Sequence, residues 1–369
     1  MRNPRIGIFM NTNKLKNLGR LALFSAAFFW GISFVLMKNV LSSIPALYVL
    51  AIRFCGAAVV LLPFCIKKTP LRKRRKHMAP HQDNASNDTN GQAVKPHRKL
   101  DRAYIFNSAL LGAALFLAYA FQTYGLQQTT PGKNAFLTSA YCIIVPFLYW
   151  AYGAFRHKTG LRGKDAAAAG GNAAFDGNAA FGGEAQLTSV VVRKRPDKFN
   201  AAAAIICVAG IGLISLERDL SIGTGDALTI ICGFFFAVHI IMIAGAVEKR
   251  DPIMIAMLQF AAAGILSMIC AFIFDPVPSG VTAADVWGMV FLTVVSTAFC
   301  IVLQIFGQKY TPPSQAAVIL TLESVFGAVS SVIIYHEVMT FRLIFGFALS
   351  FAAVVISETK LGFLRKKSV

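Results

Sequence analysis

The chain has 369 residues, of which 56% are hydrophobic and only 14% charged, with a formal net charge of +19. Soluble domains carry about 25% charged residues, so this composition and a mean hydropathy of +0.60 argue against a soluble protein and predict a multi-spanning membrane protein. The positive charge does not indicate a nucleic-acid partner, because Lys and Arg lie between apolar runs and form no basic face with interleaved aromatic residues.

A basic arm at 1–20 precedes the first apolar run, as in a signal peptide. No A-x-A cleavage site follows it and many more apolar runs come later, so we expect an uncleaved first helix. The 7 cysteines all fall inside apolar runs and form no C-x-x-C pair. We expect them to be small buried side chains rather than disulfides or metal ligands.

A bilayer core about 30 Å thick requires roughly 20 mostly apolar residues per helix. Ten segments meet this requirement: 21–39, 45–66, 104–124, 133–152, 200–216, 226–246, 252–274, 285–307, 314–335 and 341–359. With a cytoplasmic N-terminus, nearly all Lys and Arg fall on the cytoplasmic side, as the positive-inside rule requires. We therefore expect a multi-pass protein of the cell (plasma) membrane with both termini in the cytoplasm.

The chain also contains an internal duplication. Arg53-Phe54 in the first half aligns with Gln259-Phe260 in the second, and Ile214-Ser215 aligns with Ile356-Ser357. A repeat this long is a duplicated domain half, since solenoid repeats run to roughly 20–50 residues. Each half has five predicted helices, an odd number, so the halves cross the membrane with opposite polarity. The expected fold is all-α, with ten transmembrane helices in two inverted five-helix repeats, the construction of secondary transporters. The matching positions, at one constant spacing, are Gln122, Gly125, Thr129, Pro131 and Ala135 with Gln304, Gly307, Thr311, Pro313 and Ala317.

The duplication divides the chain into regions. The basic arm 1–20 is followed by the first repeat at 21–216 and the second at 223–359, and a basic tail occupies 360–369. Within the first repeat, the loops 67–103 and 153–198 cannot bury enough apolar surface to fold, so we expect both to be disordered in the cytoplasm. A basic run in the first loop either binds anionic lipid or serves only as a topology determinant and linker. That run consists of Arg72, Lys73, Arg74, Arg75 and Lys76.

Enzyme signatures are missing from the sequence. It contains no H-E-x-x-H, no G-x-x-x-x-G-K-[ST], no G-x-S-x-G and no cluster of carboxylates. We therefore expect no catalytic residues, no metal site and no cofactor. His336 and Glu337 follow the ninth span, and two polar neighbours do not make a metal site.

Ionisable residues inside the spans are costly in lipid and mark the transport path by default. Glu323 lies about 14 Å into the ninth span at 1.5 Å per residue, and either serves transport or makes a structural salt bridge or interhelical hydrogen bond. Arg53 in the second span is either an ion-pair or coupling partner of Glu323 or a staple that bonds backbone carbonyls of a neighbouring helix. Lys38, near the end of the first span, can extend to the membrane surface.

The candidates for a substrate cavity near the membrane midplane are Trp30, Gln122, Tyr141, His239, Gln304 and Glu323. Gln122 and Gln304 face this cavity or join helices by hydrogen bonds. His239 contacts substrate or a proton, or bonds a neighbouring helix. Small residues on the tenth span provide either internal packing or a homodimer face. They are Gly346, Ala348, Ser350 and Ala352.

Three stretches resemble the EamA branch of the drug/metabolite transporter superfamily: Trp30 to Lys38, Arg53-Phe54, and the ninth span ending at His336-Glu337. The resemblance covers about 21–150 and 224–359. It implies ten helices in two inverted repeats that move small metabolites such as amino acids, often outwards, through a central cavity. The family commonly has Pro after the midpoint acid of the ninth helix, where this chain has Ser324, and its loops are usually shorter.

We therefore expect a secondary active transporter of a small metabolite that works by alternating access around a midplane cavity. One alternative is a membrane-embedded enzyme acting on lipid-linked intermediates, which needs convergent His, Asp or Glu side chains at one depth. Another is a non-transporting membrane scaffold recruited by its basic loops, which does not need paired polar residues at the midplane.

Overall fold

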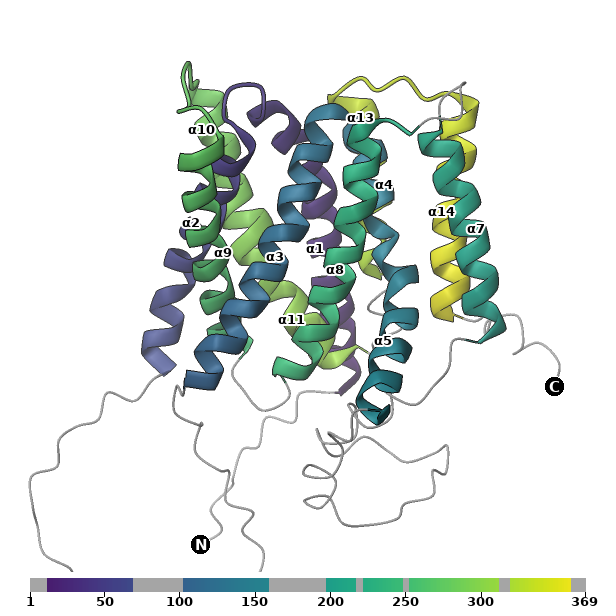
Figure 1. Cartoon of the computed structure of the whole chain (residues 1–369), viewed down its shortest axis with the longest axis horizontal. Helices are drawn as coiled ribbons and strands as arrows, with labels where there is room; N and C mark the ends of the chain where they lie inside the picture. The colour runs from purple at the N-terminus through teal and green to yellow at the C-terminus, as the bar shows by residue number, and fades with distance from the viewer. Residues whose placement is uncertain are drawn as a thin grey trace, which may run out of the picture.

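The structure, a computed structural model, describes residues 12–68, 102–158, 197–216, 222–247, 252–311 and 319–359. Within these ranges the protein is helical apart from one isolated bridge between Leu216 and Ile222. The helices lie side by side in a bundle, and α7 and α14 stand together at one flank (Figure 1). The end of the bundle at the top of Figure 1 is called the upper end, and the opposite end the lower end.

The helices follow one another up and down the bundle (Figure 1). The first half of the chain forms α1 (Thr12–Val40), α2 (Ala46–Lys68), α3 (Arg102–Gln128), α4 (Pro131–Ser139), α5 (Tyr141–Lys158) and α7 (Lys198–Ser215). The second half forms α8 (Thr224–Val247), α9 (Pro252–Phe274), α10 (Ala283–Val290), the π-helix η1 (Phe291–Phe299), α11 (Cys300–Tyr310), α13 (Leu322–Ile334) and α14 (Phe341–Thr359).

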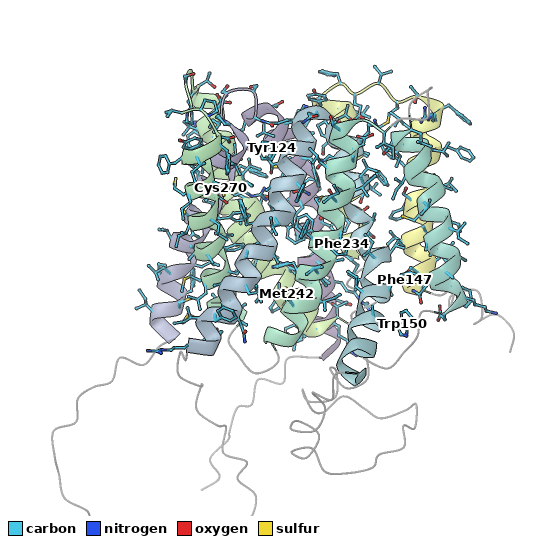
Figure 2. The ribbon with its side chains drawn as sticks, in the orientation of Figure 1. Tyr124, Phe147, Trp150, Phe234, Met242 and Cys270 are labelled. Carbon is cyan, nitrogen blue, oxygen red and sulfur yellow. The ribbon has the colours of Figure 1, made fainter. Side chains whose placement is uncertain are left out.

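The described helices are those of a multi-pass integral membrane protein. Among them, 7 stretches are long and apolar enough to cross a membrane: Leu15–Val40, Ala46–Ile66, Tyr104–Gln128, Lys198–Ser215, Thr224–Ile243, Ile253–Phe274 and Ala283–Gln304. Apolar side chains cover the outer surface (Figure 2), and large ones such as Ile205 and Phe272 are exposed. Trp150 on the lower part of α5 and Trp287 at the start of α10 are also exposed, as expected for aromatic residues at membrane interfaces.

Some predicted spans are interrupted rather than continuous. The segment predicted at 133–152 is divided at Ala140, whose N–H bonds the Leu137 carbonyl at 3.3 Å in a tight turn between α4 and α5. The described part of the span predicted at 314–335 is interrupted at Thr321, directly before α13. In the span predicted at 285–307, a π-helical stretch lies between α10 and α11. No Gly or Pro stands at Ala140 or Thr321, so the sequence contained no breaker to signal these turns.

The packing of α1, α13 and α4 brings two of the interrupted spans together. α1 crosses α13 at Gly31, where an added Cβ would lie 2.4 Å from the Cβ of Phe326. α13 in turn crosses α4 at Gly327, where an added Cβ would lie 2.6 Å from the Cβ of Ala135. Contacts this short require glycine, because no larger residue fits without moving backbone.

The small residues of α14 are used partly within the protein. Gly346 and Ser350 face α7, where an added Cβ on Gly210 would lie 2.5 Å from the Ser350 hydroxyl oxygen. Ala348 is exposed and Ala352 half-buried. Internal packing therefore explains the first pair, and a homodimer through α14 stays a prediction.

Candidate functional site

The two interrupted spans meet at Tyr141 and Glu323. Tyr141 is the first residue of α5 and Glu323 lies in the first turn of α13, so each side chain directly follows a helix break. The Tyr141 hydroxyl donates a hydrogen bond to Glu323 Oε1 at 3.3 Å across 182 residues of chain. The same spacing separates Gln122 from Gln304, so Tyr141 and Glu323 hold matching positions in the two halves.

Glu323 is buried with spare hydrogen-bonding capacity. Its side chain is 6% exposed, and among the described residues the Tyr141 hydroxyl is its only hydrogen-bond partner. The adjacent Ser324 hydroxyl is buried and has no partner in the described part of the chain. The first turn of a helix favours a carboxylate, because its free N–H groups form the positive end of the helix dipole. This site can therefore hold a carboxylate while leaving it able to bind a further proton or ligand.

A row of aromatic rings links Glu323 to Arg53. The rings of Tyr141 and Phe236 lie 6.2 Å apart, and those of Phe236 and Tyr119 lie 5.1 Å apart. The Arg53 guanidinium stands 4.8 Å from the centre of the Tyr119 ring. Among the described residues Arg53 and Glu323 make no direct contact, so in this conformation the aromatic row separates the two buried charged groups.

Arg53 bonds side chains of the π-helix rather than backbone. Its Nε donates to the Thr297 hydroxyl at 2.5 Å and its Nη2 to the Ser296 hydroxyl at 3.0 Å. Its Nη1 approaches the Met37 sulfur at 3.6 Å. The expected alternative, a staple on backbone carbonyls, does not describe these contacts. Trp30 makes that kind of contact instead, because its Nε1 donates to the Ser296 carbonyl at 2.7 Å.

The remaining candidates lie around this centre. Gln122 donates to the Thr138 hydroxyl at 3.2 Å, half a turn before the break in the α4–α5 span. His239 on α8 lies 3.1 Å from the side-chain oxygen of Gln259 on α9, so it joins two helices. Gln304 on α11 is half-buried and makes no side-chain hydrogen bond within the described residues. The two glutamines thus differ in their surroundings despite their matching positions.

One buried polar group was not singled out from the sequence. The Asn134 amide is fully buried on α4 and donates to the Thr229 hydroxyl at 2.8 Å and to the Gln122 carbonyl at 3.2 Å. It therefore fastens α4 to α8 and α3 above the break. The available signal was an asparagine inside an apolar run, which is costly in a membrane unless it is bonded.

A group of charged and polar side chains lies at the upper end, and we call it the upper polar network: Lys38, Thr130, Lys133, Asp226 and Glu337. Lys133 and Asp226 form an ion pair at 2.7 Å between α4 and α8. Lys38, in the last turn of α1, donates to the carbonyls of Leu126, Gln127 and Thr129 at 2.7 to 2.9 Å. These are orphan carbonyls at the C-terminal end of α3, which favour a cation.

Glu337 fastens the end of α13 to the start of α4. Its carboxylate, 8% exposed, accepts hydrogen bonds from the Thr130 and Ser331 hydroxyls and from the Gly132 N–H at 3.1 Å. His336 adopts a left-handed backbone conformation with φ 58, which turns the chain after α13 just before Glu337. No role beyond a position at the end of the ninth span was predicted for this carboxylate.

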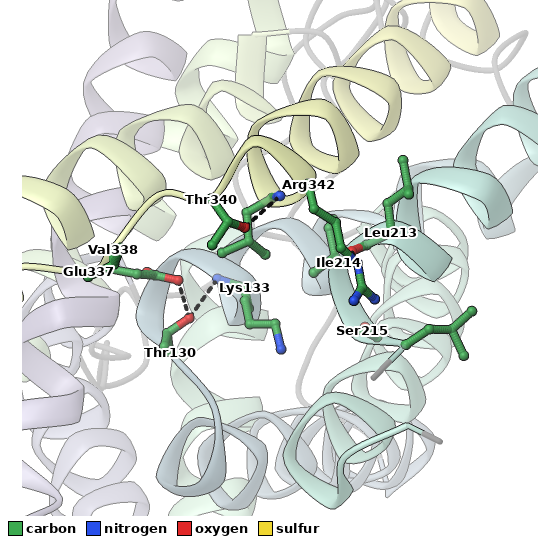
Figure 3. A pocket seen from close by; sticks show the side chains of 11 residues that line it. Thr130, Lys133, Leu213, Ile214, Ser215, Glu337, Val338, Thr340 and Arg342 are labelled. Atoms are coloured by element: carbon green, nitrogen blue, oxygen red, sulfur yellow. Dashed lines mark hydrogen bonds between the residues drawn. The ribbon is translucent and has the colours of Figure 1, made fainter. Parts of the chain in front are cut away.

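A cavity of about 530 Å³ opens at the upper end, between the starts of α4 and α14 and the end of α7 (Figure 3). Its lining includes Thr130, Lys133, Glu337 and Arg342, and neither Glu323 nor Arg53 belongs to it. The Arg342 guanidinium donates to the Leu213 carbonyl at 2.7 Å, so it caps α7. In the described part of the chain no three His, Cys, Asp or Glu side chains gather as metal ligands.

Comparison with known proteins adds the family. An "uncharacterized transporter" of Archaeoglobus fulgidus is 28% identical over 246 residues, which span 67% of this chain and 66% of that protein. The chain thus spans about two thirds of that relative's length. A solved crystal structure of a protein superimposes with a TM-score of 0.56 at 13% identity, covering 95% of this chain and 99% of the other, so the fold is shared. The EamA-like transporter family matches residues 17–156 and 223–359, which include Arg53, Tyr141 and Glu323, and the chain therefore belongs to this family of membrane transporters.

Proposed function

We propose that the protein is a secondary active exporter of a small metabolite, such as an amino acid, in the plasma membrane. The observation that carries this proposal is the Tyr141–Glu323 hydrogen bond at two matching helix breaks. Discontinuous helices that cross near the membrane midplane are the usual sites of substrate and ion binding in transporters. A buried carboxylate there needs a reason, because ionisable groups inside membranes are costly.

The proposed architecture is ten membrane crossings in two inverted five-helix repeats. In this arrangement α4 with α5 makes one crossing, and α10, η1 and α11 together make another. Contacts between matching residues support it, because a residue on the axis relating two repeats meets its own counterpart. Tyr141 bonds Glu323 in this way, and the Phe54 ring stacks on Phe260 with centroids 5.9 Å apart. The separate family matches to 17–156 and 223–359 also fit one repeat each.

Alternating access requires one end of the bundle to close while the other opens. The upper polar network supplies the closure in this conformation, since Glu337 and Asp226 hold the start of α4 against α13 and α8. We assign the lower end to the cytoplasm, because nearly all Lys and Arg then lie on that side. Release of the substrate to the exterior then requires the bonds of Glu337 and Asp226 to the start of α4 to break.

Glu323 is the proposed coupling group, which binds a proton in one half of the cycle and releases it in the other. Glu323→Gln imitates the protonated side chain permanently. We expect this variant to fold and to lose the dependence of uphill transport on an imposed pH gradient. Tyr141→Phe removes the only hydrogen bond that Glu323 accepts from the described residues, and is expected to keep gradient-driven transport with a displaced pH profile.

The test uses proteoliposomes loaded with a small-molecule extract of the expressing cells, with and without a pH gradient. Protein-dependent loss of any compound from the lumen is followed by mass spectrometry. Ser267→Ala, which removes a buried hydroxyl bonded to the Ala263 carbonyl within α9, serves as a control for a buried polar change away from the helix breaks, and should keep the gradient dependence. Unchanged gradient-driven loss in Glu323→Gln would rule out Glu323 as the coupling group.

A further inference from the structure

Arg53 is a buried cation whose contacts are all neutral. Its side chain is 2% exposed and is among the largest fully buried side chains of the described protein. Within the described residues it donates hydrogen bonds to the Thr297 and Ser296 hydroxyls and the Met37 sulfur, and it stands over the Tyr119 ring. A guanidinium has five N–H donors, so these few acceptors leave part of its capacity unused. Burying such a charge without an opposite charge is strongly unfavourable.

The fold itself does not require a cation at this position. The matching residue in the second half is Gln259, whose neutral amide is equally buried, at 2% exposed, and bonds His239 at 3.1 Å. The ring after each of these residues packs in the same way, since Phe54 and Phe260 stack on one another. A neutral side chain therefore satisfies the same place in the architecture, and the charge of Arg53 needs another explanation.

The surroundings of Arg53 are suited to an anionic ligand. The Thr297 hydroxyl donates its hydrogen to the Leu292 carbonyl at 2.7 Å. Its oxygen is therefore left to accept from Arg53 Nε, which fixes the orientation of the guanidinium. Thr293, four residues earlier on η1, is buried with a hydroxyl that has no partner in the described part of the chain, and it contacts Gly56 one turn from Arg53. π-helical turns occur frequently at functional sites.

The partner now covering the guanidinium face is one that an anion can displace. Cation–π contacts are weaker than the paired hydrogen bonds that a carboxylate makes to a guanidinium. Tyr119 belongs to the aromatic row that continues through Phe236 to Tyr141 and Glu323. A ligand with its acidic group on Arg53 would place its apolar body along these rings.

We propose that Arg53 is a substrate-binding residue, and that the exported molecule is a small organic anion whose acidic group pairs with this guanidinium when Tyr119 moves aside. The proposal rests on the transport function proposed above and adds the chemical class of the substrate. A carboxylate or another planar oxyanion bound by two N–H groups fits the fork of the guanidinium.

The test uses the same proteoliposomes loaded with cell extract, with no pH gradient, and sorts the compounds that leave by their charge. We expect the exported compounds to carry an acidic group. Arg53→Gln, which copies the residue of the second half, should slow their loss by about tenfold to a hundredfold, the usual value of a charge-assisted hydrogen bond. Arg53→Lys should restore part of the rate, because it keeps the charge without the fork.

Arg342→Gln is the matched control, since Arg342 is a guanidinium outside the upper polar network that bonds only the backbone carbonyls of Leu213 and Gly212 in the described structure. It should lower the melting temperature without changing which compounds leave. The role of Arg53 would be overturned if only neutral or cationic compounds left the vesicles. It would also be overturned if acidic compounds left at an unchanged rate through folded Arg53→Gln. Either result would still establish transport itself. Loss of no compound from wild-type vesicles would overturn the transport function, and the inference with it.

Discussion

Replacing Glu337 by glutamine tests whether the upper polar network is a gate. The carboxylate accepts three hydrogen bonds, from Thr130, Gly132 and Ser331, and a carboxamide oxygen can replace only one carboxylate oxygen. One charge-assisted bond is therefore lost and the others become neutral, a change of about 2 to 3 kcal/mol. If these bonds exist only while the upper end is closed, the ratio of open to closed protein rises roughly 30- to 150-fold.

Cys232 provides a native reporter of that opening. It is fully buried on α8, about 12 Å below the start of the helix at 1.5 Å per residue, and its sulfur lies 3.5 Å from the Thr138 hydroxyl on α4. With the other cysteines replaced by alanine, a membrane-impermeant thiol reagent applied from outside measures how often this position becomes accessible. We expect Glu337→Gln to raise the rate of labelling by the factor given above.

Asp275→Asn is the matched control for the gate. Asp275 also sits at the upper end and accepts hydrogen bonds from the Leu47 N–H at 2.8 Å and the Tyr124 hydroxyl at 3.0 Å. Among the described residues its hydrogen bonds reach neither α4 nor α13. It should lower the melting temperature without exposing Cys232. The gate would be refuted if Glu337→Gln and wild type were labelled at equal rates while Glu337→Gln and Asp275→Asn lost similar stability. Glu337 would then only stabilise the ends of its helices.

Two further predictions concern topology and packing. Reporter fusions after Gly182 should report cytoplasm and fusions after Gly280 the exterior, and a reversed result at either point would contradict the orientation and the inverted repeats. Gly31→Ala should lower the melting temperature in detergent by an amount equivalent to about 1 to 3 kcal/mol, because its Cβ would meet Phe326 at 2.4 Å. Gly212→Ala, where the nearest atom is 3.5 Å away, is the tolerated control, and equal melting of the two variants would show that α1 and α13 can separate at no cost.

The hydropathy and the length of each apolar segment predicted where the described helices lie, because the thickness and apolar character of a bilayer set both quantities. They were insufficient to predict the interruptions at Ala140 and Thr321, which depend on how two spans cross and carry no local breaker. The π-helical part of the span over 285–307 contains Thr293, Ser296 and Thr297, but hydroxyl residues are common in membrane helices and do not distinguish π-helical turns from ordinary helix.

The cost of burying charge singled out Glu323 and Arg53, but it did not reveal their partners. Glu323 bonds Tyr141, which was named only as a lining residue, because partners 182 residues apart are set by the repeat geometry rather than by neighbouring sequence. Arg53 bonds Ser296 and Thr297. Small polar residues of this kind are common in membrane helices, so these two did not indicate a binding partner by themselves. The bonding partners of Lys38 were not predicted, because the orphan carbonyls of α3 are visible only once that helix is seen to end beside it.

The contact between Tyr141 and Glu323 has an evolutionary consequence. When a gene for half a bundle duplicates, every residue on the axis initially faces an identical copy of itself. Two carboxylates in hydrogen-bond contact repel unless they share a proton, and two tyrosines there contain no group that carries a charge at neutral pH. Only unlike residues, such as Tyr141 and Glu323, combine a single ionisable group with a neutral donor at such a pair of positions.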